Sequence, residues 1–148
     1  MRVNQVAKLL NVTPDTVRFY TRNKVLQPNK SDTTGYREYS NKEVNRLRFV
    51  LSARQLGFSV ADIKQILAEA DDDQAPCLTV RRLIDQRLHE TEQRFSEMLA
   101  LRTRMKQAVL EWSDKPDKLP TSDMICHLIE DFSFPNNKHD KLAVTVSE

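Results

Sequence analysis

The sequence predicts a mainly α-helical protein with a helical head that carries a hairpin wing, one long helix, and a short C-terminal loop and helix. Three observations support this fold class. Apolar residues recur at helical spacing through most of the chain, capping residues precede the expected helix starts, and neither Gly nor Pro occurs from Cys77 to Trp112. The expected parts are a head over residues 1–70, a long helix over 76–112, a loop and short helix over 113–132, and a flexible tail over 133–148.

Charge is distributed unevenly along the 148 residues. Residues 1–67 carry 12 Lys and Arg against 5 Asp and Glu, a net charge of +7, whereas residues 68–148 carry a net charge of −5. A positive charge concentrated at one end is typical of a phosphate-binding surface. The chain has no apolar run near the roughly 18 residues that span a bilayer and no secretory signal. We therefore expect a cytoplasmic protein, without a membrane partner, whose two cysteines are reduced.

Two short helices separated by a tight turn open the head. The first is expected over about Val3–Leu10, and the turn falls at Asn11–Val12. Thr13 is the expected N-cap of the second helix, which runs over about Pro14–Arg22 and has the proline at its first position. The inward face of this second helix is expected to carry Val17 together with either Phe19 or Tyr20.

A hairpin wing is expected after the second helix. The chain turns at Ser31–Gly35 and continues into Gly35–Tyr39, where aromatic and basic side chains alternate. An exposed helix followed by such a wing suits duplex DNA, because Arg contacts bases in the major groove while tyrosine hydroxyls and basic groups contact phosphates. In the alternative interpretation, Phe19 and one or more of the tyrosines belong to the core. The candidate DNA-binding residues are Thr13, Thr16, Arg18, Tyr20, Arg22, Tyr36, Arg37, Tyr39 and Arg54.

Two further helices complete the head. Ser40–Glu43 is expected to form a capping box for a third helix over Asn41–Leu56, and Gly57 ends that helix. Ser59–Asp62 is expected to cap a fourth helix. The acidic stretch over residues 70–76 is the expected linker between the head and the rest of the chain.

The long helix carries an apolar stripe at heptad spacing, which predicts a coiled coil. Seven of nine positions spaced four and three apart are apolar, and a lone helix cannot bury such a stripe, so we expect self-association. Beyond it, Ser122 is the expected cap of a short final helix that carries Ile125, Leu128, Ile129 and Phe132. The nine stripe positions are Ile84, Leu88, Thr91, Phe95, Met98, Arg102, Met105, Val109 and Trp112.

Head, long helix, loop and short final helix together resemble the MerR family of bacterial regulators. The matching segments are Val17–Tyr20, Gly35–Tyr39 and Leu47–Phe58, and the resemblance extends over about residues 1–132. It implies a winged helix-turn-helix head and an antiparallel coiled-coil dimerisation helix. It also implies a homodimer that binds a pseudo-palindromic promoter site, distorts the DNA when an effector binds, and so activates transcription by RNA polymerase.

Within the family, the chain is most similar to the metal-responsive branch. Members of that branch place a Cys at the start of the dimerisation helix, as Cys77 is here, and another before a short apolar helix, as Cys126 is here. The resemblance implies that Cys77 of one subunit meets Cys126 of the partner subunit around an effector, Zn²⁺ or another divalent ion. His127 or a nearby carboxylate is a further candidate ligand. The third Cys that is usual at the end of the dimerisation helix is absent, since Trp112–Asp114 stands there.

Other functions stay open at this point. The cysteines are alternatively small buried apolar residues in a regulator with a non-metal inducer, or thiols that sense a redox signal. A coiled-coil adaptor would also use the long helix, although it would not need a basic wing. The sequence shows no Gly-rich phosphate loop, catalytic triad or paired-carboxylate pattern, so we do not expect an enzyme.

Overall fold

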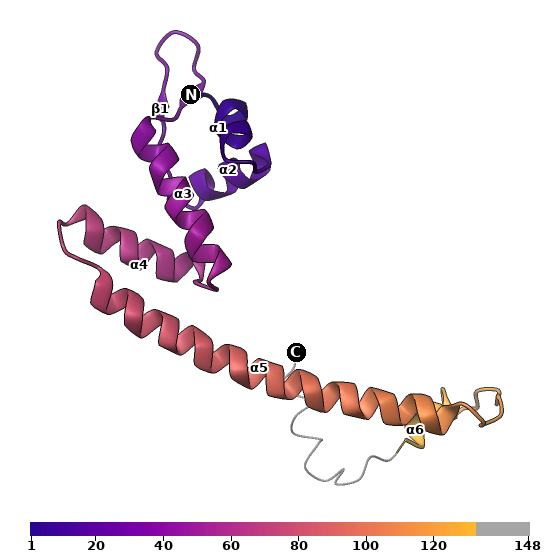
Figure 1. Cartoon of the computed structure of the whole chain (residues 1–148). Coiled ribbons are helices and arrows are strands. Elements are labelled where there is room, and N and C mark those ends of the chain that lie inside the picture. The colour runs from indigo at the N-terminus through magenta and orange to yellow at the C-terminus, as the bar shows by residue number, and fades with distance from the viewer. Residues whose placement is uncertain (133–148) are drawn as a thin grey trace. The chain divides into compact units, whose positions relative to one another are not determined.

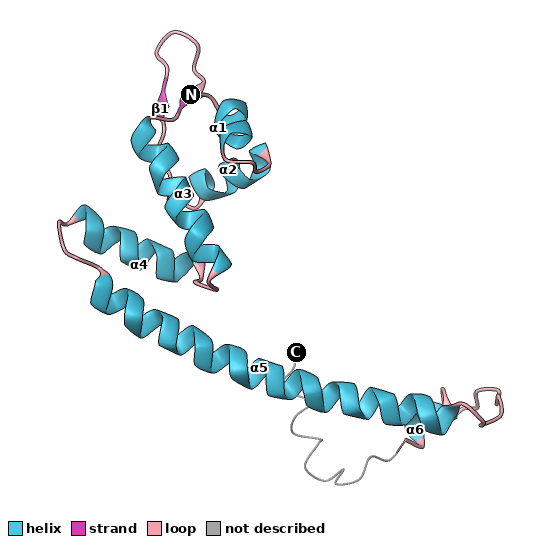
Figure 2. Cartoon of the chain, viewed as in Figure 1, coloured by secondary structure: helices cyan, strands magenta, loops and turns pink. Residues whose placement is uncertain are grey.

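The computed structural model describes residues 1–132 of the chain. This part is mainly α-helical, as Figure 2 shows, which confirms the predicted fold class. It contains two compact units, residues 1–90 and the part of the chain from Thr91 onward. The elements labelled in Figure 1 are α1 (Val3–Leu9), α2 (Pro14–Arg22), β1 (Asn29–Lys30), β2 (Arg37–Glu38), α3 (Asn41–Gln55), α4 (Val60–Asp71), α5 (Cys77–Trp112) and α6 (His127–Glu130).

The core of the head lies among α1, α2, α3 and α4. Each of these helices buries residues three or four positions apart, which is the spacing that predicted them. Burying a side chain of this size contributes roughly 1.5–3 kcal/mol, so the core orders the four helices relative to one another. The side chains with at most 2% exposure are those of Val6, Val17, Val25, Leu26, Tyr39, Leu47, Val50, Ile63 and Ile66.

The caps predicted for α3 and α4 differ in the structure. At α4 the box is complete, because Ser59 Oγ accepts from the Asp62 N–H and Asp62 Oδ2 accepts from the Ser59 N–H. At α3 only half of it forms. Ser40 Oγ accepts from the Glu43 N–H, but Glu43 is buried and its Oε2 accepts from the Gln27 N–H at 2.9 Å. Glu43 therefore joins α3 to the segment that leaves α2, a role that its sequence neighbours do not indicate.

Polar contacts and apolar packing tie the start of α5 to α4. Arg87 Nε lies 3.0 Å from Asp62 Oδ2, and Thr79 Oγ1 donates to Glu69 Oε1 at 2.6 Å. Leu83 is 3% exposed and belongs to the core of the head. The compact unit therefore extends to Glu90, beyond the boundary expected near residue 70, because the first turns of α5 pack onto α4.

Several helix ends differ from the predicted ones. Helix α1 ends at Leu9, and α3 ends at Gln55, where Gly57 adopts a φ of +91° that permits the turn into α4. The final helix is shorter than predicted, and its N-cap is Cys126, so the expected Ser122 cap is wrong. Residues 121–126 form an irregular, bent segment instead, with the Thr121 N–H donating to the Met124 carbonyl. The predicted tail over 133–148 lies outside the described residues.

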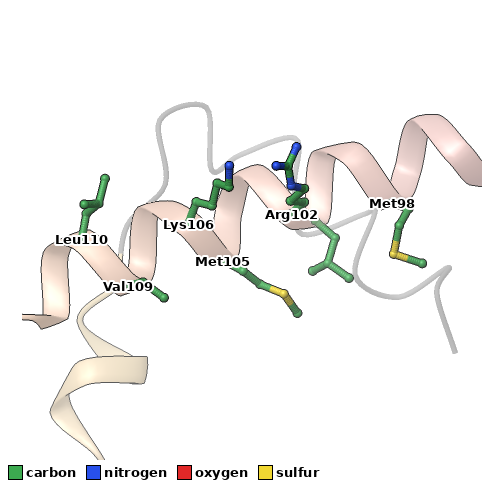
Figure 3. A pocket seen from close by; sticks show the side chains of 7 residues that line it. Met98, Arg102, Met105, Lys106, Val109 and Leu110 are labelled. Carbon is green, nitrogen blue, oxygen red and sulfur yellow. The ribbon is translucent and has the colours of Figure 1, made fainter.

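The middle of α5 leaves its predicted stripe uncovered in a single chain. Phe95, Met98 and Met105 are 64%, 65% and 57% exposed. Figure 3 shows Met98, Met105 and Val109 projecting on one side of α5, and Arg102, Lys106 and Leu110 projecting on the other. With Leu101, these side chains line a surface hollow of about 460 Å³. Among residues 1–132, no helix is both long enough and apolar enough to cross a membrane.

Candidate nucleic-acid interface and effector end

Local hydrogen bonds fix the start of α2. Thr13 is its N-cap, and its Oγ1 accepts from the Thr16 N–H at 3.2 Å and lies 2.9 Å from Thr16 Oγ1. Pro14 occupies the first helical position, where an N–H would have no partner in the helix. The two predicted threonines are therefore part of the cap that sets where α2 begins, and their hydroxyls are already engaged with each other.

The core fixes which face of α2 is exposed. Val17 and Tyr20 are 0% and 6% exposed, and they anchor one side of the helix in the head. At about 100° per residue, the opposite side carries Asp15, Arg18 and Arg22, which lie three and four positions apart. All three are exposed. We call this set the outward stripe of α2, and it presents two guanidinium groups and one carboxylate to solvent.

Arg18 and Asp15 form an ion pair within the outward stripe. Arg18 Nη1 lies 2.8 Å from Asp15 Oδ1, and the two side chains are 46% and 90% exposed. A pair this open contributes little to stability, about 0.3–0.5 kcal/mol for neighbours on a helix. Its effect is geometric, because it holds the Arg18 guanidinium along the outer side of α2.

The wing presents a basic and aromatic surface. Its turn is closed by the Gly35 N–H, which donates to the Ser31 carbonyl at 2.9 Å, and Gly35 has a φ of +71°. Tyr36 is 60% exposed, and the following Arg37 is also exposed. The Arg2 guanidinium carbon lies 4.6 Å from the centroid of the Tyr36 ring, a cation–π contact. Arg2 therefore adds a positive charge to the surface of the wing. The sequence analysis did not predict this contact, although the charge of Arg2 is evident beside the first predicted helix.

The structure places the other two candidate tyrosines in the core. Tyr20 is 6% exposed, and Tyr39 is 2% exposed with its hydroxyl 2.8 Å from Thr21 Oγ1. Both rings therefore belong to the core, as in the alternative interpretation. Phe19 shows the reverse, since it is 40% exposed and meets the Tyr20 ring edge-on at 5.0 Å. The helical register turns Tyr20, and not Phe19, towards the core.

Arg54 has a structural partner. Its Nη1 donates to the Phe58 carbonyl at 2.8 Å, across the turn that follows α3. This contact satisfies a carbonyl at the turn that positions α4. Because the residue is exposed and a guanidinium has five N–H groups, a phosphate contact by the remaining donors is compatible with this role.

The candidate effector end is built around α6. Cys126 is half-buried and extended, with φ −142° and ψ 112°, so it precedes the helix instead of starting it. Glu130 Oε2 accepts from the Ile125 and Cys126 N–H groups at 2.9 and 2.7 Å and fixes this conformation. The Trp112 and Phe132 rings meet edge-on at 5.9 Å. The end of α5 and the end of the described chain therefore meet in an aromatic contact.

His127 is held by the loop that follows α5. Its side chain is 7% exposed, and its Nε2 lies 2.8 Å from the Pro116 carbonyl. A carbonyl only accepts, so Nε2 donates this hydrogen bond, and Nδ1 lies 4.0 Å from Asp131 Oδ2. A backbone partner on the second ring nitrogen is common for metal-binding histidines, and it also suits a purely structural histidine.

The described part of one chain does not bring a set of metal ligands together. Cys77 is exposed at the start of α5, and both cysteines are free thiols. Within residues 1–132, no group of three His, Cys, Asp or Glu side chains is placed to hold an ion.

Comparisons with known proteins agree with this architecture. Residues 1–70 match the family model described as MerR HTH family regulatory protein, and residues 44–108 match that described as MerR, DNA binding. The HTH-type transcriptional regulator ZntR of Escherichia coli (strain K12) is 31% identical over 130 residues, which cover 87% of this chain and 89% of that protein. The chain belongs to the MerR family. It is a DNA-binding transcriptional regulator and not an enzyme. The alternative hypothesis of a coiled-coil adaptor is therefore abandoned.

Other relatives in the MerR family fit the predicted place in its metal-responsive branch. A protein of Haemophilus influenzae named as a probable heavy metal-dependent transcriptional regulator is 28% identical over 77% of this chain and 86% of its own length. The transcription regulator PbrR691 from Ralstonia metallidurans CH34, solved in complex with lead(II), has the same fold. Its TM-score is 0.68 at 23% identity, covering 89% of this chain and 99% of that one. As a MerR regulator, the chain has promoter DNA, RNA polymerase and a second copy of itself as partners.

Proposed function

We propose that this regulator inserts α2 of each protomer into the major groove of a pseudo-palindromic promoter site, with the wing on the flanking backbone. The observation that carries this proposal is the outward stripe of α2, where Arg18 and Arg22 are exposed opposite the buried Val17 and Tyr20. Arginine in the major groove forms paired hydrogen bonds to guanine. Tyr36 and Arg37 of the wing contact phosphates, which positions the head without selecting a sequence.

Activation by DNA distortion is the second part of the proposal. The two heads of the dimer hold one promoter, so a change in the angle between them bends and untwists the DNA between the half-sites. Such deformation costs several kcal/mol, and the phosphate contacts of the two heads offset it. An effector that binds the distorting state more tightly shifts the population towards it, and RNA polymerase then finds its promoter elements aligned. Promoter binding and contact with polymerase imply a cytoplasmic protein.

A salt-dependent binding measurement tests the DNA contacts. In the full chain, Arg18→Ala should weaken binding to a selected site and relax the base preference at one position in each half-site. Arg37→Ala should weaken binding to all sequences alike and reduce the slope of log K against log salt by about one. Arg94→Ala, on the exposed surface of α5, is the matched control and should leave both quantities unchanged. Unchanged base preference in Arg18→Ala would contradict the assignment of α2 to the major groove.

We propose a divalent metal ion, such as Zn²⁺, as the effector. Cys77 of one protomer and Cys126 of the partner subunit would supply two thiolates, and a carboxylate or His127 would complete the set. Because the donors within residues 1–132 of one chain do not gather, we assign the remaining ligands to the partner subunit. The extended backbone at Cys126 supports this proposal, since Cys126 and His127 are not fixed about 100° apart as they would be within a helix. The metal would supply the cross-link that selects one arrangement of the two heads.

Zinc competition with a chromophoric chelator tests the effector. The reduced dimer should bind zinc tightly, and Cys77→Ser and Cys126→Ser should each lose that binding. His89→Ala, an exposed histidine of α5, is the control for weak surface binding and should behave like the unaltered protein. Equal zinc affinity in all four proteins would refute the cysteine site. Two free thiols would then favour a redox signal, which is measured as a thiol-dependent change in promoter activity.

A further inference from the structure

Asp15 is an acidic residue on a surface that otherwise attracts DNA. The head has four other acidic residues up to position 67, and two of them, Glu43 and Asp62, are buried with the partners described above. Asp32 and Glu38 lie in the wing. Asp15 is the one acid within α2, and its side chain is 90% exposed on the same stripe as Arg18 and Arg22. A carboxylate there repels phosphates, so a contact with the DNA backbone does not explain it.

The position of Asp15 matches a contact with base edges. Asp15 and Arg18 are three residues apart, a rise of about 4.5 Å along α2. This rise is close to one base step of B-DNA, roughly 3.4 Å. Side chains that lie beside each other on the outer face of a helix in the major groove therefore face neighbouring base pairs. A carboxylate in that groove accepts from the exocyclic N4 amino group of cytosine, whereas guanine offers it only acceptors.

We propose that Asp15 is a specificity-determining residue. Its carboxylate accepts a hydrogen bond from a cytosine amino group at the base pair next to the guanine contacted by Arg18. The Asp15–Arg18 pair at 2.8 Å prepares this contact, because it uses one guanidinium N–H and leaves the remaining donors to face the groove. The two residues thus select two adjacent base pairs as a unit. This inference rests on the proposed placement of α2 in the major groove.

A second effect of Asp15 must be separated from this one. An acid in the first turn of a helix stabilises the helix, whatever the helix binds. That effect would change binding to all sequences alike and would leave base preference untouched. Base preference, measured by selection from randomised half-sites, is therefore the decisive quantity, and affinity alone is not.

Binding-site selection with the full-length dimer tests the proposal on Asp15→Asn and Asp15→Ala. The unaltered protein should select cytosine at one position per half-site beside the guanine lost in Arg18→Ala. Asp15→Asn should shift that preference towards adenine, because an amide forms paired bonds to adenine N6 and N7. Asp15→Ala should lose the preference, a loss of roughly five- to a hundredfold in discrimination. Asp32→Asn in the wing is the matched charge control and should select the same site as the unaltered protein.

The outcomes distinguish the specificity role of Asp15 from the placement of α2 in the major groove. Identical base preferences in the unaltered protein and both Asp15 variants would overturn the specificity role and leave Asp15 as a helix-stabilising residue. If the base preference relaxes in Arg18→Ala but in neither Asp15 variant, the specificity role of Asp15 is also overturned, while the proposed placement of α2 stands. Failure of the unaltered protein to select any site would instead overturn the placement of α2. Should Asp15→Ala not fold, as judged by circular dichroism, the switch to adenine in Asp15→Asn decides the question.

Discussion

Phe95 lies in the middle of the uncovered stripe of α5, and replacing it should weaken the dimer. The ring is 64% exposed in the single chain, and its stripe neighbours Leu88 and Met98 are 55% and 65% exposed. We expect a second copy of the chain to cover this stripe, because the homodimer is the assembly of the family. Phe95→Ala removes one large apolar side chain from each protomer without touching the core of the head.

The expected magnitude follows from the exposed area. A phenylalanine can bury about 150–250 Å², so a side chain that is 64% exposed still offers roughly 100–160 Å² to a partner. At about 25 cal/mol per Å², that area contributes roughly 2.5–4 kcal/mol in each protomer. Alanine retains part of it, so we expect a loss of about 4 kcal/mol per dimer, or roughly a thousandfold in the dissociation constant.

Sedimentation equilibrium over a range of concentrations measures this constant. Leu110→Ala is the matched control, because Leu110 is 70% exposed on α5 but projects away from Met98 and Met105 in Figure 3. It should change the dissociation constant less than tenfold. Equal weakening by the two substitutions, or none by Phe95→Ala, would show that the heptad stripe is not the dimer seam. Helix content by circular dichroism should be unchanged in both variants.

Three further predictions concern single elements of the fold. Glu43→Ala should lower the free energy of unfolding by about 1–3 kcal/mol in a urea titration, because it removes the charged acceptor of the part-buried Gln27 N–H hydrogen bond. Glu38→Ala, in the exposed wing, should stay within about 0.5 kcal/mol. Glu130→Ala should reduce zinc affinity roughly tenfold or more, since it frees the backbone at Cys126, while helix content stays constant. A chain ending at Glu90 should sediment as a folded monomer, and a dimer would place the association surface within the head.

The outline of the fold follows from interactions between residues close in sequence. Helix spacing, the Thr13 and Ser59 caps, and the long stretch without Gly or Pro that became α5 each act within a few residues. Sequence reasoning therefore predicted the order of the helices and most of their starts. It was wrong at Ser122, because the loop there is held by Glu130, whose carboxylate accepts from two backbone N–H groups outside α6.

The division between core and surface depended on contacts between distant residues. Phe19 is the more hydrophobic of two adjacent aromatic residues, yet the register of α2 against the head buries Tyr20 and exposes Phe19. Tyr39 looked like a phosphate-binding residue until its hydroxyl was found beside Thr21, 18 residues away. The pairing of Arg2 with Tyr36 likewise joins the start of the chain to the wing.

The sequence by itself determined the helical class, the basic head, the outward arginines of α2 and the unpartnered stripe of α5, because charge and periodicity are local properties. Only the tertiary structure decided that Glu43 and Tyr39 serve the core, that the head extends to Glu90, and that His127 is tied to the loop at Pro116. Those outcomes depend on which segments pack together. A hydrogen bond between residues far apart in the sequence cannot be inferred from the pattern of residues around either partner.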